Sequence, residues 1–151
     1  MGFGLFFRPM SLAGRTILLV EDNEDDVFFM EDTLKRAGIK NPMHVARDGQ
    51  RAVDYLSGVG GYADRSRFPM PCLVLLDLML PRMNGLEVLR WMRQNPETRE
   101  MVVTVLSGSI LQSDMVLAYQ TGANAYLVKP PTLEKLESLT RVAGDCWVRA
   151  S

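Results

Sequence analysis

The chain has 151 residues, of which 47% are hydrophobic and 23% are charged, as in a folded globular protein of about one domain and unlike a disordered chain. Its 17 Lys and Arg residues nearly balance its 18 Asp and Glu residues, and the two signs are mixed along the chain, so no nucleic-acid partner is expected. The longest largely apolar stretch, Leu73–Leu78 with Asp77 inside it, is far shorter than the ~20 residues that cross a bilayer, so no membrane partner is expected either.

The N-terminal residues 1–14 are expected to form a loose arm ahead of one domain at residues 15–151. The apolar run in this segment is too brief for a signal peptide, and its one charge, Arg8, follows the run instead of preceding it. Residues 1–9 leave two interpretations open: a native arm that docks on a partner, and an extension ahead of a natural start at Met10.

The two cysteines, Cys72 and Cys146, are too few for a disulfide framework, and neither lies in a CxxC motif or a histidine-rich cluster. We therefore expect both to be small buried hydrophobic residues of a protein in the reducing cytoplasm.

Strand-like and helix-like segments alternate from Thr16 onward, which predicts an α/β fold with a parallel sheet and helices on both faces. Between the second helix and the third strand, residues 57–71 are rich in Gly, Pro, Asp, Arg and Ser and predict a long surface loop. The predicted strands are Thr16–Val20, His44–Ala46, Cys72–Asp77, Val102–Leu106 and Ala125–Val128. The predicted helices are the one that Asn23 caps and Gly38 closes, Asp48–Leu56, the one that begins near Leu86 and stops at Asn95, Ser113–Thr121, and Thr132 to about Trp147.

Polar residues stand at the ends of four predicted strands. Glu21 and Asp22 follow the first strand, Asp77 ends the third, Ser107 follows the fourth, and Lys129 follows the fifth. Ligands of such sheets bind outside the carboxyl ends of the strands, and carboxylates that converge there repel each other unless a cation neutralises them. Because all the ligands are oxygens, Mg²⁺ is favoured over zinc. With an amine and a hydroxyl beside the metal, Asp77 is a candidate nucleophile for phosphoryl transfer.

Four stretches that contain these residues resemble the response-regulator receiver domains of two-component signalling. The resemblance covers nearly all of the chain from Arg15 onward, and the four stretches occur in the family's order. The resemblance implies a flavodoxin-like (CheY-like), doubly wound sheet of five parallel strands in the order 2-1-3-4-5. The stretches are ILLVEDN at Ile17–Asn23, LVLLDLMLPRMNGLEVL at Leu73–Leu89, LSGS at Leu106–Ser109 and AYLVKPP at Ala125–Pro131.

The resemblance also implies a role for each site residue. Glu21 would join the metal site directly or through water, and the bond between Lys129 and Pro130 would be cis. The implied roles are Asp77 as phospho-acceptor, Ser107 and Lys129 as its catalytic partners, Glu21, Asp22, Asp77 and the backbone carbonyl of Met79 around Mg²⁺, and Ser107 and Tyr126 as switch residues.

Two departures from the family pattern occur. Asn84 stands where many relatives have Asp, but Asn caps a helix as well as Asp does, so phosphorylation is not put in doubt. Pro131 replaces a bulky apolar residue, which affects how the last helix meets partners. His44 is expected to be a packed or surface residue without a role.

The lengthened loop before the third strand resembles single-domain regulators that work with phytochrome-type histidine kinases. With no output domain expected, the protein would signal through protein contacts and catalyse only its own phosphorylation and dephosphorylation. We expect a homodimer or kinase-docking surface on the last two helices and the fifth strand. Trp147 near the chain end is either part of that surface or folded back on the domain.

Three rival functions stay open. An aspartate-nucleophile phosphatase would carry an acid two residues after its nucleophile, where this chain has Met79. A flavodoxin-like FMN carrier would need a phosphate-binding loop in place of Glu21 and Asp22. A phosphorylation-independent pseudo-receiver scaffold would not need every functional position filled.

Overall fold

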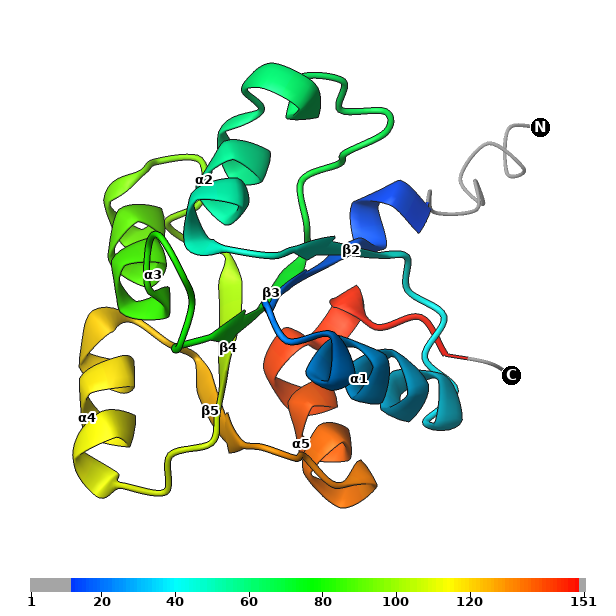
Figure 1. The fold of residues 1–151 in the computed structure, drawn as a ribbon. Helices are drawn as coiled ribbons and strands as arrows, with labels where there is room; N and C mark the ends of the chain where they lie inside the picture. The colour runs from blue at the N-terminus through cyan, green and yellow to red at the C-terminus, as the bar shows by residue number, and fades with distance from the viewer. Residues whose placement is uncertain (1–11, 150–151) are drawn as a thin grey trace.

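A five-stranded parallel sheet forms the centre of the computed structural model, which describes residues 12–149 (Figure 1). The strand order is β2-β1-β3-β4-β5, which confirms the expected α/β topology. The strands are β1 (Ile17–Val20), β2 (Met43–Ala46), β3 (Leu73–Asp77), β4 (Val102–Ser107) and β5 (Ala125–Val128). The helices are α1 (Glu24–Arg36), α2 (Gly49–Ser57), α3 (Gly85–Gln94), α4 (Gln112–Thr121) and α5 (Leu133–Ala143).

The sheet separates two hydrophobic cores. Helices α1 and α5 cover one face, and α2, α3 and α4 cover the other (Figure 1). Successive residues of β1 point to opposite faces, so that Leu18 and Val20 pack with α2 and α3 while Ile17 and Leu19 pack with α1 and α5. Both faces of the strand are therefore buried, which explains why its sequence is a continuous apolar run.

Three helices begin with a side-chain cap, and the caps at Asn23 and Asn84 are the two that the sequence predicts. The side chains of Asn23, Asp48 and Asn84 each accept a hydrogen bond of 2.7–2.9 Å from a backbone N–H three residues further along. Asp48 thus precedes α2 as its cap instead of being its first residue. Asn84 caps α3 in place of the Asp of many relatives, so this departure leaves the helix start intact.

The segment between α2 and β3 is ordered by aromatic packing and one arginine. The rings of Tyr55, Tyr62 and Phe68 lie with centroids 5.1–5.9 Å apart. The Arg65 guanidinium donates hydrogen bonds of 2.6 and 2.8 Å to the last carbonyls of α2. The apolar periodicity of the sequence could not reveal this packing, because the contacts join Tyr55 of α2 to residues of the segment that follows the helix.

Helix α5 ends at Ala143 and not near Trp147, because Gly144 adopts a φ of 49° that a continuing helix cannot have. The chain then turns back, and the Trp147 indole donates a hydrogen bond of 3.2 Å to the Leu139 carbonyl. Trp147 is half-buried against the α1 and α5 core. Of the two alternatives expected for Trp147, the structure shows the one in which the side chain folds back on the domain.

The expectation that both cysteines are unpaired is wrong. Cys72, just before β3, and Cys146, after α5, form a disulfide between residues that are 74 apart in sequence. Their Cα atoms lie 5.7 Å apart, within the range of disulfides. Two isolated cysteines gave no signal of this pairing, because it depends on the return of the chain after α5.

No helix within residues 12–149 is long and apolar enough to span a bilayer. Residues 1–11 lie outside the described residues, so the loose arm stays a prediction for them. The remaining arm residues belong to a short 3-10 helix at Leu12–Arg15.

The disulfide leads to a prediction about stability. Reduction should lower the free energy of unfolding by about 2–4 kcal/mol, because the oxidised bond closes a long loop in the unfolded chain. Urea unfolding with and without reductant measures the change, with the variant Cys146→Ser as the control that reductant should not affect. Equal stability of the wild-type chain in both conditions would contradict the pairing.

Candidate functional site

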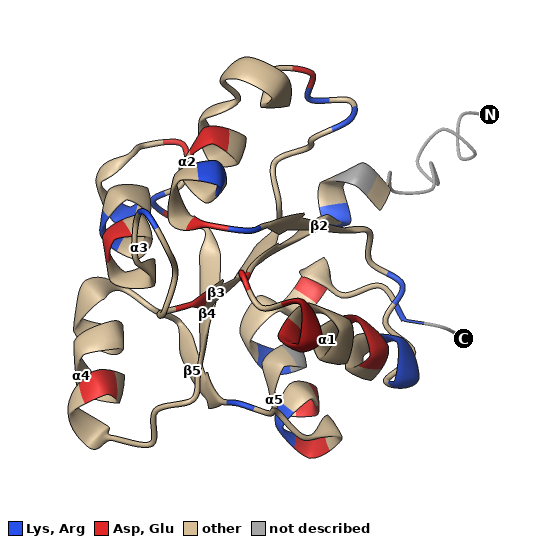
Figure 2. Cartoon of the chain, in the orientation of Figure 1, with Lys and Arg blue, Asp and Glu red and all other residues tan. Residues whose placement is uncertain are grey.

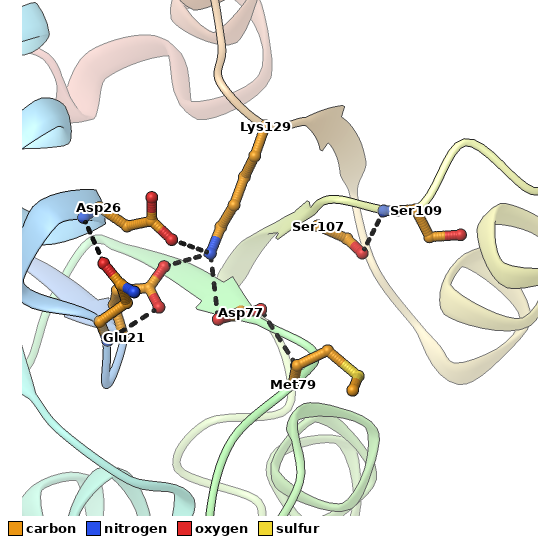
Figure 3. A network of polar contacts seen from close by, with 8 residues as sticks. Glu21, Asp26, Asp77, Met79, Ser107, Ser109 and Lys129 are labelled. Carbon is orange, nitrogen blue, oxygen red and sulfur yellow. Dashed lines mark hydrogen bonds and ion pairs between the residues drawn. The ribbon is translucent and has the colours of Figure 1, made fainter.

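Four of the predicted site residues meet at the carboxyl edge of the sheet, since the ends of parallel strands lie side by side (Figure 3). Glu21 directly follows β1, Asp77 and Ser107 end β3 and β4, and Lys129 directly follows β5. The exposed fractions of Glu21, Asp77 and Ser107 are at most 5%. The convergence predicted from the strand ends is therefore confirmed.

The Lys129 ammonium connects the site (Figure 3). It donates a very short hydrogen bond to the Glu21 carboxylate and bonds of 3.0 Å to Asp77 and 3.1 Å to Asp26. The peptide bond between Lys129 and Pro130 is cis, as the resemblance implied. The lysine thus balances one negative charge where several gather.

The carboxylates of Glu21, Asp22 and Asp77 can offer oxygen atoms that all lie within 4.8 Å of one another. Glu21 and Asp77 are buried and Asp22 is exposed, so the group opens to solvent on one side. An all-oxygen donor set with excess negative charge is typical of sites for hard divalent cations. The residues therefore fit a divalent metal.

Burial and the neighbouring charges shift the pKa values of Glu21 and Lys129 in the site. Burial, followed by the hydrogen bond with Asp77, raises the pKa of Glu21 from its ordinary 4.5 to about 7, although Lys129 acts in the opposite direction. Burial alone would lower the pKa of Lys129, but its bonds to Glu21 and Asp77 outweigh burial and raise that pKa. The amine is therefore charged at neutral pH, while the acidic group still lacks a full counter-charge.

The turn after β3 holds Asp77 in place. The Met79 backbone N–H donates a hydrogen bond of 3.0 Å to the Asp77 carboxylate, while the Met79 side chain is 78% exposed. Gly85 lies so close to the end of β3 that a Cβ at this position would come within 2.2 Å of the Asp77 carbonyl oxygen. Only glycine allows this approach.

The end of β4, the residues after it and Tyr126 form a second polar network, which the Lys129 backbone N–H joins through a hydrogen bond of 2.8 Å to the Ser107 carbonyl. The Ser107 hydroxyl accepts a hydrogen bond of 3.1 Å from the Ser109 backbone N–H, and the Tyr126 hydroxyl donates one of 3.0 Å to the Ser109 carbonyl. Tyr126 is half-buried. A groove beside this network leads past Met79 and Asn84, which gives access to the Asp77 side of the site.

One participant was missed from the sequence, and one residue was rightly left out. Asp26, in the first turn of α1, has no predicted role in the site, yet its side chain contacts Lys129. The sequence gives no signal of this contact, because it depends on how far the side chain reaches from α1. His44 packs near Tyr55 and Phe68 with ring centroids 5.7 and 5.5 Å away, apart from the site.

The family model for the response regulator receiver domain matches residues 17–141, and the chain belongs to this family of signalling domains. It is 34% identical over 134 residues to response regulator Rcp1 of Synechocystis, covering 89% of each chain.

Three solved structures extend the comparison. The bacteriophytochrome response regulator AtBRR matches with a TM-score of 0.80 and 37% identity, covering 91% of this chain and 98% of that one. The Mn²⁺-bound form of Rcp1 has a TM-score of 0.70 at 36% identity, with 85% and 89% covered. The phosphorylated cyanobacterial phytochrome response regulator RcpA has a TM-score of 0.72 at 34% identity, with 87% and 90% covered. The homologues are thus associated with phytochromes.

The raised pKa of Glu21 leads to a prediction for the metal-free protein. Between pH 4.5 and about 7 the unfolded chain ionises Glu21 while the native state keeps the proton, so stability falls as pH rises through this window. The loss should be on the order of 1–3 kcal/mol, measured by urea unfolding in chelator. Glu21→Gln should flatten the profile, and the exposed Glu31→Gln should not. A profile unchanged by Glu21→Gln would contradict the assignment.

Proposed function

We propose that this protein is a single-domain response regulator that accepts a phosphoryl group onto Asp77 from a histidine kinase, in a Mg²⁺-dependent reaction. The observation that carries the proposal is the contact of the Lys129 ammonium with Asp77 and Glu21 beside a cluster of carboxylates. The phytochrome association of its homologues supports a phytochrome-type kinase as the donor.

In the proposed reaction a carboxylate oxygen of Asp77 attacks the phosphorus of the kinase phosphohistidine. An oxygen–phosphorus bond forms, and the phosphorus–nitrogen bond of the donor breaks and leaves its imidazole. Lys129 stabilises the negative charge on the transferred group, and Ser107 donates its hydroxyl to a phosphoryl oxygen. In this way the chain catalyses its own phosphorylation. Attack of water on the phosphorus then breaks the new oxygen–phosphorus bond, and the chain catalyses its own dephosphorylation.

Mg²⁺ would supply positive charge to the phosphoryl oxygens and relieve the repulsion among the acids. The residues proposed to hold it are Asp22, Asp77 and the backbone carbonyl of Met79, with Glu21 directly or through water. The existence of a Mn²⁺-bound form of Rcp1 supports a divalent cation as the ligand of the acidic cluster.

The proposed output is a switch built on Ser107 and Tyr126. Movement of the Ser107 hydroxyl toward a phosphoryl group would break its bond with Ser109, whose carbonyl holds Tyr126. Tyr126 could then turn into the vacated space, so that a charge change at Asp77 becomes a packing change near α4 and β5.

We propose residues 15–151 as the receiver domain and residues 1–14 as its arm. We also propose a cytoplasmic location, based on a histidine kinase as the partner of the family. The cysteines now argue against this compartment, because Cys72 and Cys146 are paired and disulfides are rare in a reducing cytoplasm, so the proposed location rests on the kinase partner alone.

The first test of the proposal is phosphorylation by a small donor. Acetyl phosphate with Mg²⁺ should add one phosphoryl group per chain in intact mass spectra. Asp77→Asn should abolish the adduct, and Asp22→Asn should raise the Mg²⁺ concentration that the reaction needs. The exposed Asp25→Asn is the matched control and should react as the wild type does.

Two outcomes would contradict the proposal. An adduct of equal yield on Asp77→Asn would place the phosphoryl group on another residue. Undiminished transfer in excess chelator would show that the reaction does not depend on a metal. A folded wild-type chain that takes no phosphoryl group would favour the pseudo-receiver scaffold. An aspartate-nucleophile phosphatase is disfavoured because the exposed Met79 offers no acid.

The partner surface is proposed to be α4, β5 and α5, used for a homodimer that phosphorylation strengthens. Among the described residues of α4, only Ala118 is buried. Exposed apolar side chains gather on this helix and just before it, which is typical of an interface. They are Ile110, Leu111, Val116, Leu117 and Tyr119.

Light scattering with and without beryllofluoride tests the dimer. The phosphate mimic should increase the mass of the wild type, and Val116→Glu should prevent the increase because it buries a charge in the interface. Gln120→Glu, an exposed polar position on the same helix, adds the same charge as a control. Equal mass in both states of the wild type would rule out a phosphorylation-linked dimer.

A further inference from the structure

The Lys129 ammonium has no N–H left for a further acceptor. A lysine ammonium carries three donors, and its contacts with Glu21, Asp26 and Asp77 use all three. Its side chain is 17% exposed. A small pocket beside the ammonium is lined in part by the apolar side chains of Leu19, Met30 and Leu106. The charge therefore lies next to a region of low polarity, which strengthens these ion pairs.

Of the three acceptors, Asp26 differs from the other two. Glu21 and Asp77 belong to the carboxylate group that fits a divalent cation, and Asp26 does not. Asp26 lies on the first turn of α1, which also carries the acidic residues Glu24 and Asp25 (Figure 2). Its carboxylate is 45% exposed and points at the ammonium from the side away from Ser107 (Figure 3).

These contacts must change when Asp77 is modified. Once Asp77 carries a phosphoryl group its carboxylate charge is lost, so its hold on the ammonium weakens, and one N–H becomes available to a phosphoryl oxygen. Glu21 would at the same time share its charge with the metal. Asp26 is then the one of the three carboxylates whose full charge still faces Lys129.

We propose that Asp26 is a positioning residue that holds the Lys129 amine at the carboxyl edge while its bond to Asp77 is exchanged for one to the phosphoryl group. The inference rests on the proposed function. Asp26 does not touch the reacting atoms, and it acts through Lys129 alone.

The first arm of the test compares two neighbouring aspartates. Asp26→Asn should slow phosphorylation by acetyl phosphate about threefold to fivefold, as expected for the loss of a partly exposed ion pair. Asp25→Asn removes the same charge from the same helix turn, but Asp25 is exposed, and its rate should stay near that of the wild type. Equal rates for the two variants, or a faster reaction of Asp26→Asn, would overturn the inference.

The second arm needs neither donor nor metal. Asp26→Asn is introduced into the wild type and into Lys129→Met, and the urea midpoint of each protein is measured in chelator. The substitution should lower the midpoint in the wild type and leave it nearly unchanged in Lys129→Met. An equal shift in both backgrounds would mean that Asp26 acts on helix α1 and not through Lys129, and would overturn the inference.

The two failures are distinguishable. If the wild type itself takes no phosphoryl group, the proposed function fails, and the midpoint cycle still reports whether Asp26 and Lys129 are coupled. If the wild type reacts but Asp26→Asn and Asp25→Asn react alike, the positioning role fails and the proposed function stands.

Discussion

The attraction between one ammonium group and the carboxylates around it is the interaction on which the site depends. Parallel strands deliver Glu21 and Asp77 to the same edge, where burial makes their mutual repulsion costly. Lys129 offsets part of this cost but carries only a single charge. Burial, with the hydrogen bond to Asp77, raises the pKa of Glu21 in spite of Lys129, and the negative charge that Lys129 leaves unbalanced fits a divalent cation. Because Lys129 only partly neutralises the carboxylates, the site responds to a cation or a phosphoryl group that is added to it.

The sheet could be predicted because its signals are local. Continuous apolar runs mark β1 and β3, Asn23 and Asn84 mark helix starts, and the strand order followed from the family resemblance. Features that depend on distant contacts could not be predicted in the same way. The disulfide of Cys72 and Cys146 and the packed segment after α2 both arise from side chains that meet only after the chain has folded.

The candidate site also contains both residues that could be predicted from the sequence and contacts that could not. Asp77 and Lys129 were predictable because backbone direction alone brings strand ends together. The contact of Asp26 was not, since it depends on how far a helix side chain reaches toward β5. The position of Trp147 was left open by the sequence for a similar reason, because its burial follows from the turn at Gly144.

The central claim is that Asp77 is the phospho-acceptor, and chemical trapping of the acyl phosphate tests it most directly. Borohydride reduces a phosphoaspartate to homoserine, which peptide mass spectrometry locates in the sequence. After reaction with acetyl phosphate and Mg²⁺, the account predicts homoserine in place of Asp77 and at no other aspartate. Homoserine at Asp22 or Asp26, with none in place of Asp77, would contradict it.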